Sequence, residues 1–169
     1  MLRDIIKTEE VLDKLTSELI HSLETEITKK SKIGLLDEMA GIALYLYYYG
    51  KLKNSSEFSK IAENLLVEIF NILNEQPNIV GHDLAEGRTG IFFTLYFLSR
   101  NNFIKSILFE YEESIDYSTY TNCLKYINDN NIDFFYGAGG LLYLLFIRLK
   151  YEKKEYLKKL YYFDIGRNI

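Results

Sequence analysis

The stretch that decides the fold is Gly90-Ile91-Phe92-Phe93-Thr94-Leu95-Tyr96-Phe97-Leu98. It has no polar face at helical spacing, so a helix formed by it needs neighbours on every side. Two other stretches open on glycine and have the same character, from Gly41 to Tyr49 and from Gly140 to Ile147. The opening glycines are 49 and 50 residues apart, and a repeat of this length is typical of stacked or ring-like helical architectures.

Amphipathic helical segments alternate with the apolar ones. Apolar residues recur at steps of three and four from Leu12 to Ile27, and again from Phe58 to Leu73. Before the second of these, residues 54–56 offer an N-cap, and Glu57 stands three residues after Asn54 in a loose capping-box arrangement. Weaker helical segments complete the pattern at residues 103–108, 120–127 and 153–161.

One apolar and one amphipathic helix per unit predict an all-α fold, a partial α/α toroid with inner and outer helix layers. We expect a single helical-repeat domain over residues 1–169, with about three helix-pair repeats of ~50 residues. The repeats start near Gly41, Gly90 and Gly140. About three repeats leave the first and last inner helices without neighbours on one flank. We therefore expect exposed apolar surface along Ile42–Tyr49 and Leu141–Ile147. The chain should then self-associate, pair with a complementary C-terminal half, or be only marginally folded.

The composition narrows the class of protein. Of 169 residues 48% are hydrophobic and 26% charged, which is ordinary for a globular protein with a real core. The 20 basic and 24 acidic residues give a net charge of −4, which argues against nucleic acid as a partner. The longest apolar runs have about ten residues, roughly half of what a membrane span needs, so no membrane span is predicted. With one cysteine and no basic-then-apolar leader, the expected location is cytoplasmic.

The lead-in to each apolar helix repeats as well. The three lead-ins are Asp37-Glu38-Met39-Ala40-Gly41-Ile42, Glu86-Gly87-Arg88-Thr89-Gly90-Ile91 and Tyr136-Gly137-Ala138-Gly139-Gly140-Leu141. Two of them read Gly-x-x-Gly followed by an apolar residue. We expect glycine there to allow a positive φ and to let the helix start pack closely against its neighbour. The unpaired N–H groups of the helix starts then lie at one end of the ring.

These lead-ins resemble those of the lanthionine synthetase C-like proteins, whose inner helices carry a Leu-x-x-Gly-x-x-Gly-Ile motif. Residues 84–91 match this motif at every fixed position. Residues 134–141 match it with aromatic and leucine replacements, and residues 35–42 keep the second glycine but have Glu38 at the first. Three motifs in register cover the chain from about residue 30 onward, which makes the resemblance specific.

The resemblance implies a toroid of seven helix pairs and a peptide cyclase activity. Members of the family close thioether rings by adding a zinc-bound cysteine of a precursor peptide to a dehydrated serine or threonine. The zinc lowers the pKa of the thiol, and an acid protonates the enolate. In the family two cysteines and a histidine of the later repeats hold the zinc. The implied partner is thus a precursor peptide, and the implied cofactor of the complete fold is zinc.

The chain departs from the family pattern at the zinc site. Seven repeats of ~50 residues need about 350 residues, whereas 169 residues hold little more than three. No Cys-His pair occurs in the sequence. We expect Cys123 to be a small packed side chain and His21 to be exposed to solvent. His82 stands beside a lead-in, but a single histidine does not make a metal or catalytic site. No cofactor is expected in this chain, and whether it is an enzyme stays open.

Two aspartates are the candidate catalytic residues. The cyclases have an aspartate seven residues before the second glycine of the third repeat, in the pattern Asp-x-x-x-Gly-x-x-Gly. Asp133 has this spacing in the third repeat, and Asp83 has it in the second. The resemblance therefore implies a catalytic carboxylate at Asp133 first and at Asp83 second. The alternative for both is a structural role, in which the carboxylate caps the N-terminus of a helix.

Three functions compete. The first is a lanthionine synthetase C-like protein involved in thioether ring formation in a ribosomally made, modified peptide, this chain lacking the zinc half. The second is a non-catalytic helical-repeat module that binds a peptide or a protein on its ring face. The third is a glycoside hydrolase, another α/α toroid, whose paired carboxylates act as acid and base. The carboxylates available for it are Asp37, Glu38, Asp83, Glu86 and Asp133. This third function is the least favoured, because the chain has no tryptophan for a sugar platform.

Overall fold

The computed structural model describes residues 2–26, 32–105 and 111–160, and every regular element in these ranges is helical. The helices are α1 (Leu2–Glu26), α2 (Met39–Lys53), α3 (Ser56–Glu75), α4 (Arg88–Arg100), α5 (Glu112–Asn128), α6 (Ala138–Glu152) and α7 (Glu155–Lys159). The predicted all-α class is confirmed. In these ranges no helix is both long and apolar enough to cross a membrane. Residues 1–31 and residues 32–169 form two compact units, and each is described by itself.

The first unit consists of α1, an uninterrupted helix of 25 residues. It begins well before the periodic stretch at Leu12, and Ile27, the last residue of that stretch, lies outside the described residues. The hydroxyl of Thr16 donates to the Leu12 carbonyl at 2.7 Å. His21 is exposed on this helix, as expected.

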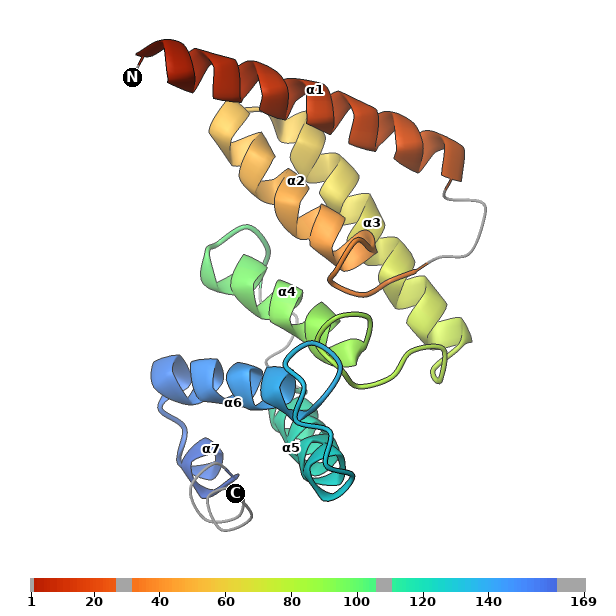
Figure 1. Cartoon of the computed structure of the whole chain (residues 1–169), viewed down its shortest axis with the longest axis vertical. Coiled ribbons are helices and arrows are strands. Elements are labelled where there is room, and N and C mark those ends of the chain that lie inside the picture. The colour runs from red at the N-terminus through yellow and green to blue at the C-terminus, as the bar shows by residue number, and fades with distance from the viewer. Residues whose placement is uncertain (1, 27–31, 106–110, 161–169) are drawn as a thin grey trace. The chain divides into compact units, whose positions relative to one another are not determined.

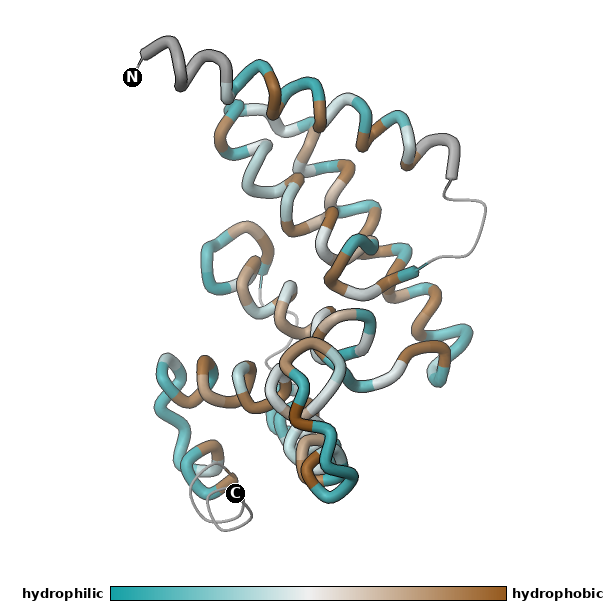
Figure 2. The backbone as a smooth tube through the Cα atoms, viewed as in Figure 1, coloured by the Kyte–Doolittle hydropathy of each residue, from teal (hydrophilic) through white to brown (hydrophobic). Residues whose placement is uncertain are grey.

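In the second unit the three apolar helices pack in succession, α2 on α4 and α4 on α6 (Figure 1). The outer helix α3 packs along α2, and α5 packs along α6. Figure 2 shows α6 mostly brown, whereas teal and brown alternate along α3. This is the two-layer order that the repeat pattern predicts, and it is consistent with a fragment of an α/α toroid.

Small and branched side chains fill the space between the inner helices and the helices that pack on them. Ala43 and Leu46 of α2 are fully buried, as is Leu98 of α4. Burying one leucine side chain stabilises the fold by about 1.5–3 kcal/mol. Between α5 and α6, Cys123 is buried in a cluster with Leu141 and other apolar residues, so it is the packed side chain that we expected.

The connection from α2 to α3 differs from the prediction. Asn54 has a φ of 51°, in the left-handed region, and closes the C-terminus of α2. The N-cap of α3 is Ser55, within the predicted residues 54–56, but its side chain makes no capping hydrogen bond. The capping box predicted for Asn54 and Glu57 is therefore wrong. Only two residues separate the helices, so Asn54 is used to end α2 and is not available to begin α3.

The second outer helix was also only partly predicted. Residues 112–128 form one helix, α5, and not the broken segments expected around residues 120–127. Its inward positions include the polar residues Glu112, Asp116 and Thr119, all buried. Because polar residues occupy buried positions of α5, its sequence lacks the regular spacing of apolar residues that predicts an amphipathic helix. Residues 103–105, which were also predicted to be helical, form no helix, and residues 106–108 lie outside the described part of the chain. Helix α7 begins at Glu155 and not at Lys153, and Tyr161, the last residue of that predicted helix, lies outside the described residues.

Candidate functional site

The loops before the three inner helices form one hydrogen-bonded ladder. They comprise residues 32–38, 81–87 and 131–137, and we call their common surface the lead-in face. The N–H groups of Leu35 and Leu36 both donate to the Ala85 carbonyl, at 2.8 and 2.9 Å. Those of Leu84 and Ala85 both donate to the Phe135 carbonyl, each at 3.0 Å. In both pairs of neighbouring loops, the N–H groups of the first two motif residues thus donate to the carbonyl of the second motif residue in the next loop.

The second glycine of each motif allows the repeats to approach one another. A Cβ built on Gly90 would lie 2.2 Å from the Leu84 carbonyl oxygen and 2.8 Å from the Cβ of Leu35. One built on Gly140 would lie 2.4 Å from the carbonyl oxygen of Phe134. Real Cβ atoms do not come so close, so close packing is the reason for glycine here, as predicted. The predicted positive φ is wrong, because none of the described glycines has one.

Asp83 and Asp133 both lie in lead-in loops and bind backbone N–H groups. Oδ1 of Asp83 accepts from Glu86 at 2.8 Å and from Gly87 at 3.2 Å. Oδ1 of Asp133 accepts from Phe135 at 2.8 Å and from Tyr136 at 2.7 Å. Both carboxylates therefore order the turn before an inner helix. Asp133 is exposed and Asp83 is half-buried. For Asp133 Oδ2 the described residues provide no hydrogen-bond donor.

Glu38 is a buried carboxylate on the lead-in face, which the sequence pattern offers only as one of the carboxylates of a glycoside hydrolase. It occupies the first glycine position of the first motif and is only 5% exposed. Its Oε2 accepts the Gly34 N–H at 2.5 Å, and its Oε1 lies 3.6 Å from Lys32 Nζ. Burial raises the pKa of Glu38, with a further rise from the Glu86 carboxylate, against the opposing effects of Gly34 and Lys32. Its one distinguishing feature in the sequence is that a glutamate stands where the motif has its first glycine.

Acidic and aromatic side chains are among those exposed on the lead-in face. Tyr136, Phe135 and Glu86 are exposed there. The Glu86 carboxylate beside the Tyr136 hydroxyl raises the pKa of the tyrosine. His82 is half-buried, and burial, together with the positive charges of Arg88 and Lys125, lowers the pKa of its imidazole. A surface of this composition offers hydrogen bonds and flat apolar contacts to a peptide.

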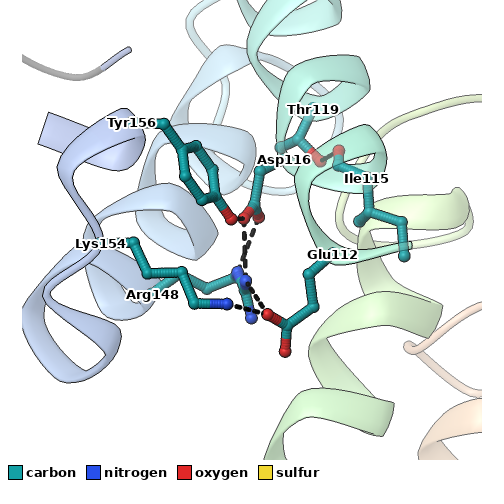
Figure 3. A network of polar contacts seen from close by, with 7 residues as sticks. All are labelled: Glu112, Ile115, Asp116, Thr119, Arg148, Lys154 and Tyr156. Atoms are coloured by element: carbon teal, nitrogen blue, oxygen red, sulfur yellow. Dashed lines mark hydrogen bonds and ion pairs between the residues drawn. The ribbon is translucent and has the colours of Figure 1, made fainter. Parts of the chain in front are cut away.

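A second cluster of charges lies between α5, α6 and α7 (Figure 3). The Asp116 carboxylate is fully buried, and its two oxygens lie 2.7 and 2.8 Å from Nε and Nη2 of Arg148. The Tyr156 hydroxyl donates to Asp116 Oδ2 at 2.7 Å. Glu112 joins Arg148 to Lys154. The adjoining cavity has a volume of about 10 Å³, which leaves no room for a substrate, so this network holds the outer helix to the inner one.

A single family model covers all the residues of the lead-in face. The family model of the lanthionine synthetase C-like proteins matches residues 29–163, which include all three lead-ins. The chain belongs to the lanthionine synthetase C-like family. Neither a curated protein nor a solved structure matches it.

The zinc of a lanthionine synthetase C-like cyclase does not fit the residues present. In the described ranges no three His, Cys, Asp or Glu side chains come together in a way that could hold a metal ion. Cys123 lies with its Sγ 3.8 Å from the Ala138 carbonyl oxygen, and burial raises the pKa of its thiol to about 11. A thiol that stays protonated is a poor zinc ligand.

Proposed function

We propose that this lanthionine synthetase C-like chain binds a ribosomally made precursor peptide on its lead-in face, as part of thioether ring formation. The observation that carries the proposal is the family match across three lead-ins that are hydrogen-bonded into one surface. The zinc-dependent step would need ligands outside the described residues, so the part assigned to this chain is recognition and positioning of the peptide.

Within this proposal Asp133 is the carboxylate available for acid–base chemistry, and Asp83 is its counterpart in the second repeat. Oδ1 of Asp133 is used by two backbone N–H groups, while the carboxylate as a whole is exposed. One oxygen can thus order the loop while the other exchanges a proton with a bound peptide.

Peptide binding is tested by fluorescence anisotropy with a labelled peptide that contains cysteine and dehydroalanine. Tyr136→Ala removes an exposed aromatic side chain of the lead-in face and should weaken binding about tenfold. Tyr117→Ala, on the outer helix α5, removes a tyrosine of similar exposure and should leave the affinity unchanged. Equal affinities for both variants, or equal binding of a peptide with alanine at the cysteine positions, would contradict the proposal.

The second candidate is a non-catalytic module that binds another protein through its helices. An exposed row of aromatic residues on the third repeat favours it: Phe134, Phe135, Tyr143 and Phe146. These side chains lie on α6 and on its lead-in loop.

A further inference from the structure

The three lead-ins close in the same way at one backbone position, nine residues before the second glycine of each motif. Lys32, Gly81 and Asn131 occupy this position. In each lead-in the carbonyl of this residue accepts the N–H of the first residue of the inner helix, which is Met39 at 3.2 Å, Arg88 at 3.0 Å and Ala138 at 3.0 Å. The backbone at this position is therefore equivalent in the three repeats, and only the side chain differs.

The side chain of Asn131 spans the third lead-in. Its Nδ2 donates to the Tyr136 carbonyl at 2.9 Å. Its Oδ1 accepts from the N–H of Asp133 at 3.4 Å, in the manner of an Asx-turn. The first bond has an ordinary length, whereas the second is long and therefore weaker. Asn131 thus links the candidate carboxylate residue to the end of the same loop, and its main contact is the one with Tyr136.

The backbone and the first motif glycine fix the place of Asn131. The N–H of Asn131 donates to the carbonyl of Tyr126, in the last turn of α5, at 2.8 Å. A Cβ built on Gly137 would collide with Oδ1 of Asn131. The glycine therefore leaves the room that the Asn131 side chain needs to cross the loop.

The other two lead-ins have different side chains at this position. Nζ of Lys32 lies 3.6 Å from Oε1 of Glu38, so in the first lead-in the side chain also acts on the carboxylate of its loop. Gly81 has no side chain that could brace the loop of Asp83. Asp83 is half-buried, whereas Asp133 is exposed. The third lead-in therefore combines a bracing side chain with an exposed carboxylate.

We propose that Asn131 is a positioning residue for the Asp133 carboxylate, and through it for the peptide on the lead-in face. By holding the Tyr136 carbonyl, Asn131 fixes the backbone of Phe135 and Tyr136, whose N–H groups bind Oδ1 of Asp133 at 2.8 and 2.7 Å. One carboxylate oxygen is thereby tied to the loop, and the other is held in a constant place for an N–H group of the peptide. This inference rests on the proposed peptide binding and adds the residue that sets the geometry of the carboxylate.

Fluorescence anisotropy with the labelled peptide that contains cysteine and dehydroalanine tests the proposal on the full chain. Asp133→Asn should weaken binding about tenfold, and Asn131→Ala should weaken it by a similar factor. Asn131→Asp keeps the size of the side chain but removes the donor to the Tyr136 carbonyl, so it should not restore binding. Asn122→Ala, on α5, is the matched control, because Nδ2 of Asn122 also donates to a backbone carbonyl, at 2.8 Å. This control should bind like the wild type.

A double variant and NMR distinguish positioning from a general loss of stability. If Asn131 acts through Asp133, Asn131→Ala combined with Asp133→Asn should weaken binding about tenfold, like the single variants, and not about a hundredfold. In the wild type the N–H resonances of Phe135 and Tyr136 should shift as acid protonates the Asp133 carboxylate. In folded Asn131→Ala these shifts should be at least about twofold smaller, because the hydrogen bonds to Oδ1 are weakened.

The possible failures can be told apart. If Asn131→Ala or Asn131→Asp binds like the wild type, if the losses in the double variant are additive, or if the N–H shifts are unchanged, this inference is overturned and peptide binding stands. If the wild type binds the peptide no better than one with alanine at the cysteine positions, the proposed function is overturned, and this inference with it.

Discussion

Gly140 lies directly against the side chain of Leu84, and a Cβ built on the glycine would stand 2.5 Å from the Cβ of the leucine. The same relation joins Gly90 to Leu35, at 2.8 Å. The second glycine of the motif is therefore a contact between repeats, and the side chain that it receives belongs to the first position of the preceding motif.

Gly140→Ala should destabilise the fold by about 1–3 kcal/mol, the cost of overpacking a site that cannot relax. The new methyl group would meet the Phe134 carbonyl as well as Leu84, and a backbone atom cannot move aside cheaply. Urea denaturation measures the loss. Gly81→Ala is the control, because its Cβ would lie 3.2 Å from one flexible carboxylate and open space otherwise. Equal losses for the two variants would disprove the contact between repeats.

Asp133→Ala should lower the free energy of unfolding by about 1–2 kcal/mol, because two backbone N–H groups lose their acceptor. Asp133→Asn retains a carbonyl oxygen and should lose less than about 1 kcal/mol. If the carboxylate is catalytic, Asp133→Asn should still strongly reduce peptide cyclisation in an assembly that has this activity. Undiminished cyclisation by this variant would leave Asp133 with an ordering role alone.

Glu38 should make stability fall as pH rises above about 4.5. Its pKa is raised in the folded state from an ordinary value of 4.5, so just above that pH the folded chain binds more protons than the unfolded chain. The stabilisation by protonated Glu38 is complete below the unfolded pKa and is lost as pH rises through the folded one. Glu38→Gln keeps an acceptor for Gly34 and removes the titration. Denaturation of both proteins between pH 4 and pH 7 gives the difference between their free energies of unfolding. As the pH rises, Glu38→Gln should become increasingly stable relative to the wild type. A constant difference would contradict the assignment.

Asp116→Ala should destabilise the chain by about 3–5 kcal/mol, because it leaves the buried Arg148 guanidinium without its main partner. Replacing both residues, as Asp116→Leu with Arg148→Met, should recover most of this loss, since an apolar pair leaves no uncompensated charge. Tyr156→Phe removes one hydrogen bond and should cost about 1 kcal/mol. A double variant as unstable as Asp116→Ala would show that packing, not charge, decides the effect.

The purified chain should bind less than one equivalent of zinc after dialysis. Two cysteines and a histidine are needed for the family's site, and Cys123 is buried as a thiol. Elemental analysis by mass spectrometry checks this. If the chain held one equivalent of zinc tightly and Cys123→Ser lost it, Cys123 would be a zinc ligand and not a packed apolar side chain.

Much of the architecture could be predicted from local pattern. Helices α2, α4 and α6 are apolar on all sides, so each had to be enclosed, and the spacing of Gly41, Gly90 and Gly140 placed them in equivalent repeats. The family followed from the same residues. The positions of Asp83 and Asp133 before an inner helix were also predicted, since their distance from the glycines is a property of the chain alone.

Other features depend on residues far apart in the chain. Asp116 and Arg148 are 32 positions apart, and the ladder joins Leu35 to Ala85, so neither leaves a periodic signal. Glu38 was missed for a different reason: its carboxylate binds the N–H of Gly34, only four residues away, but the sequence pattern does not show that this short loop buries a carboxylate.

The sequence by itself determined which segments are helices, which of them lie inside, and where the repeats begin, because these properties follow from periodicity and from the cost of exposing apolar surface. Only the tertiary structure decided that the glycines serve close packing and not a positive φ, and that Phe146 is exposed where Tyr47 and Tyr96 are covered. The physical reason is that burial and backbone contact depend on the neighbouring repeat, and equivalent positions of the three motifs meet different neighbours.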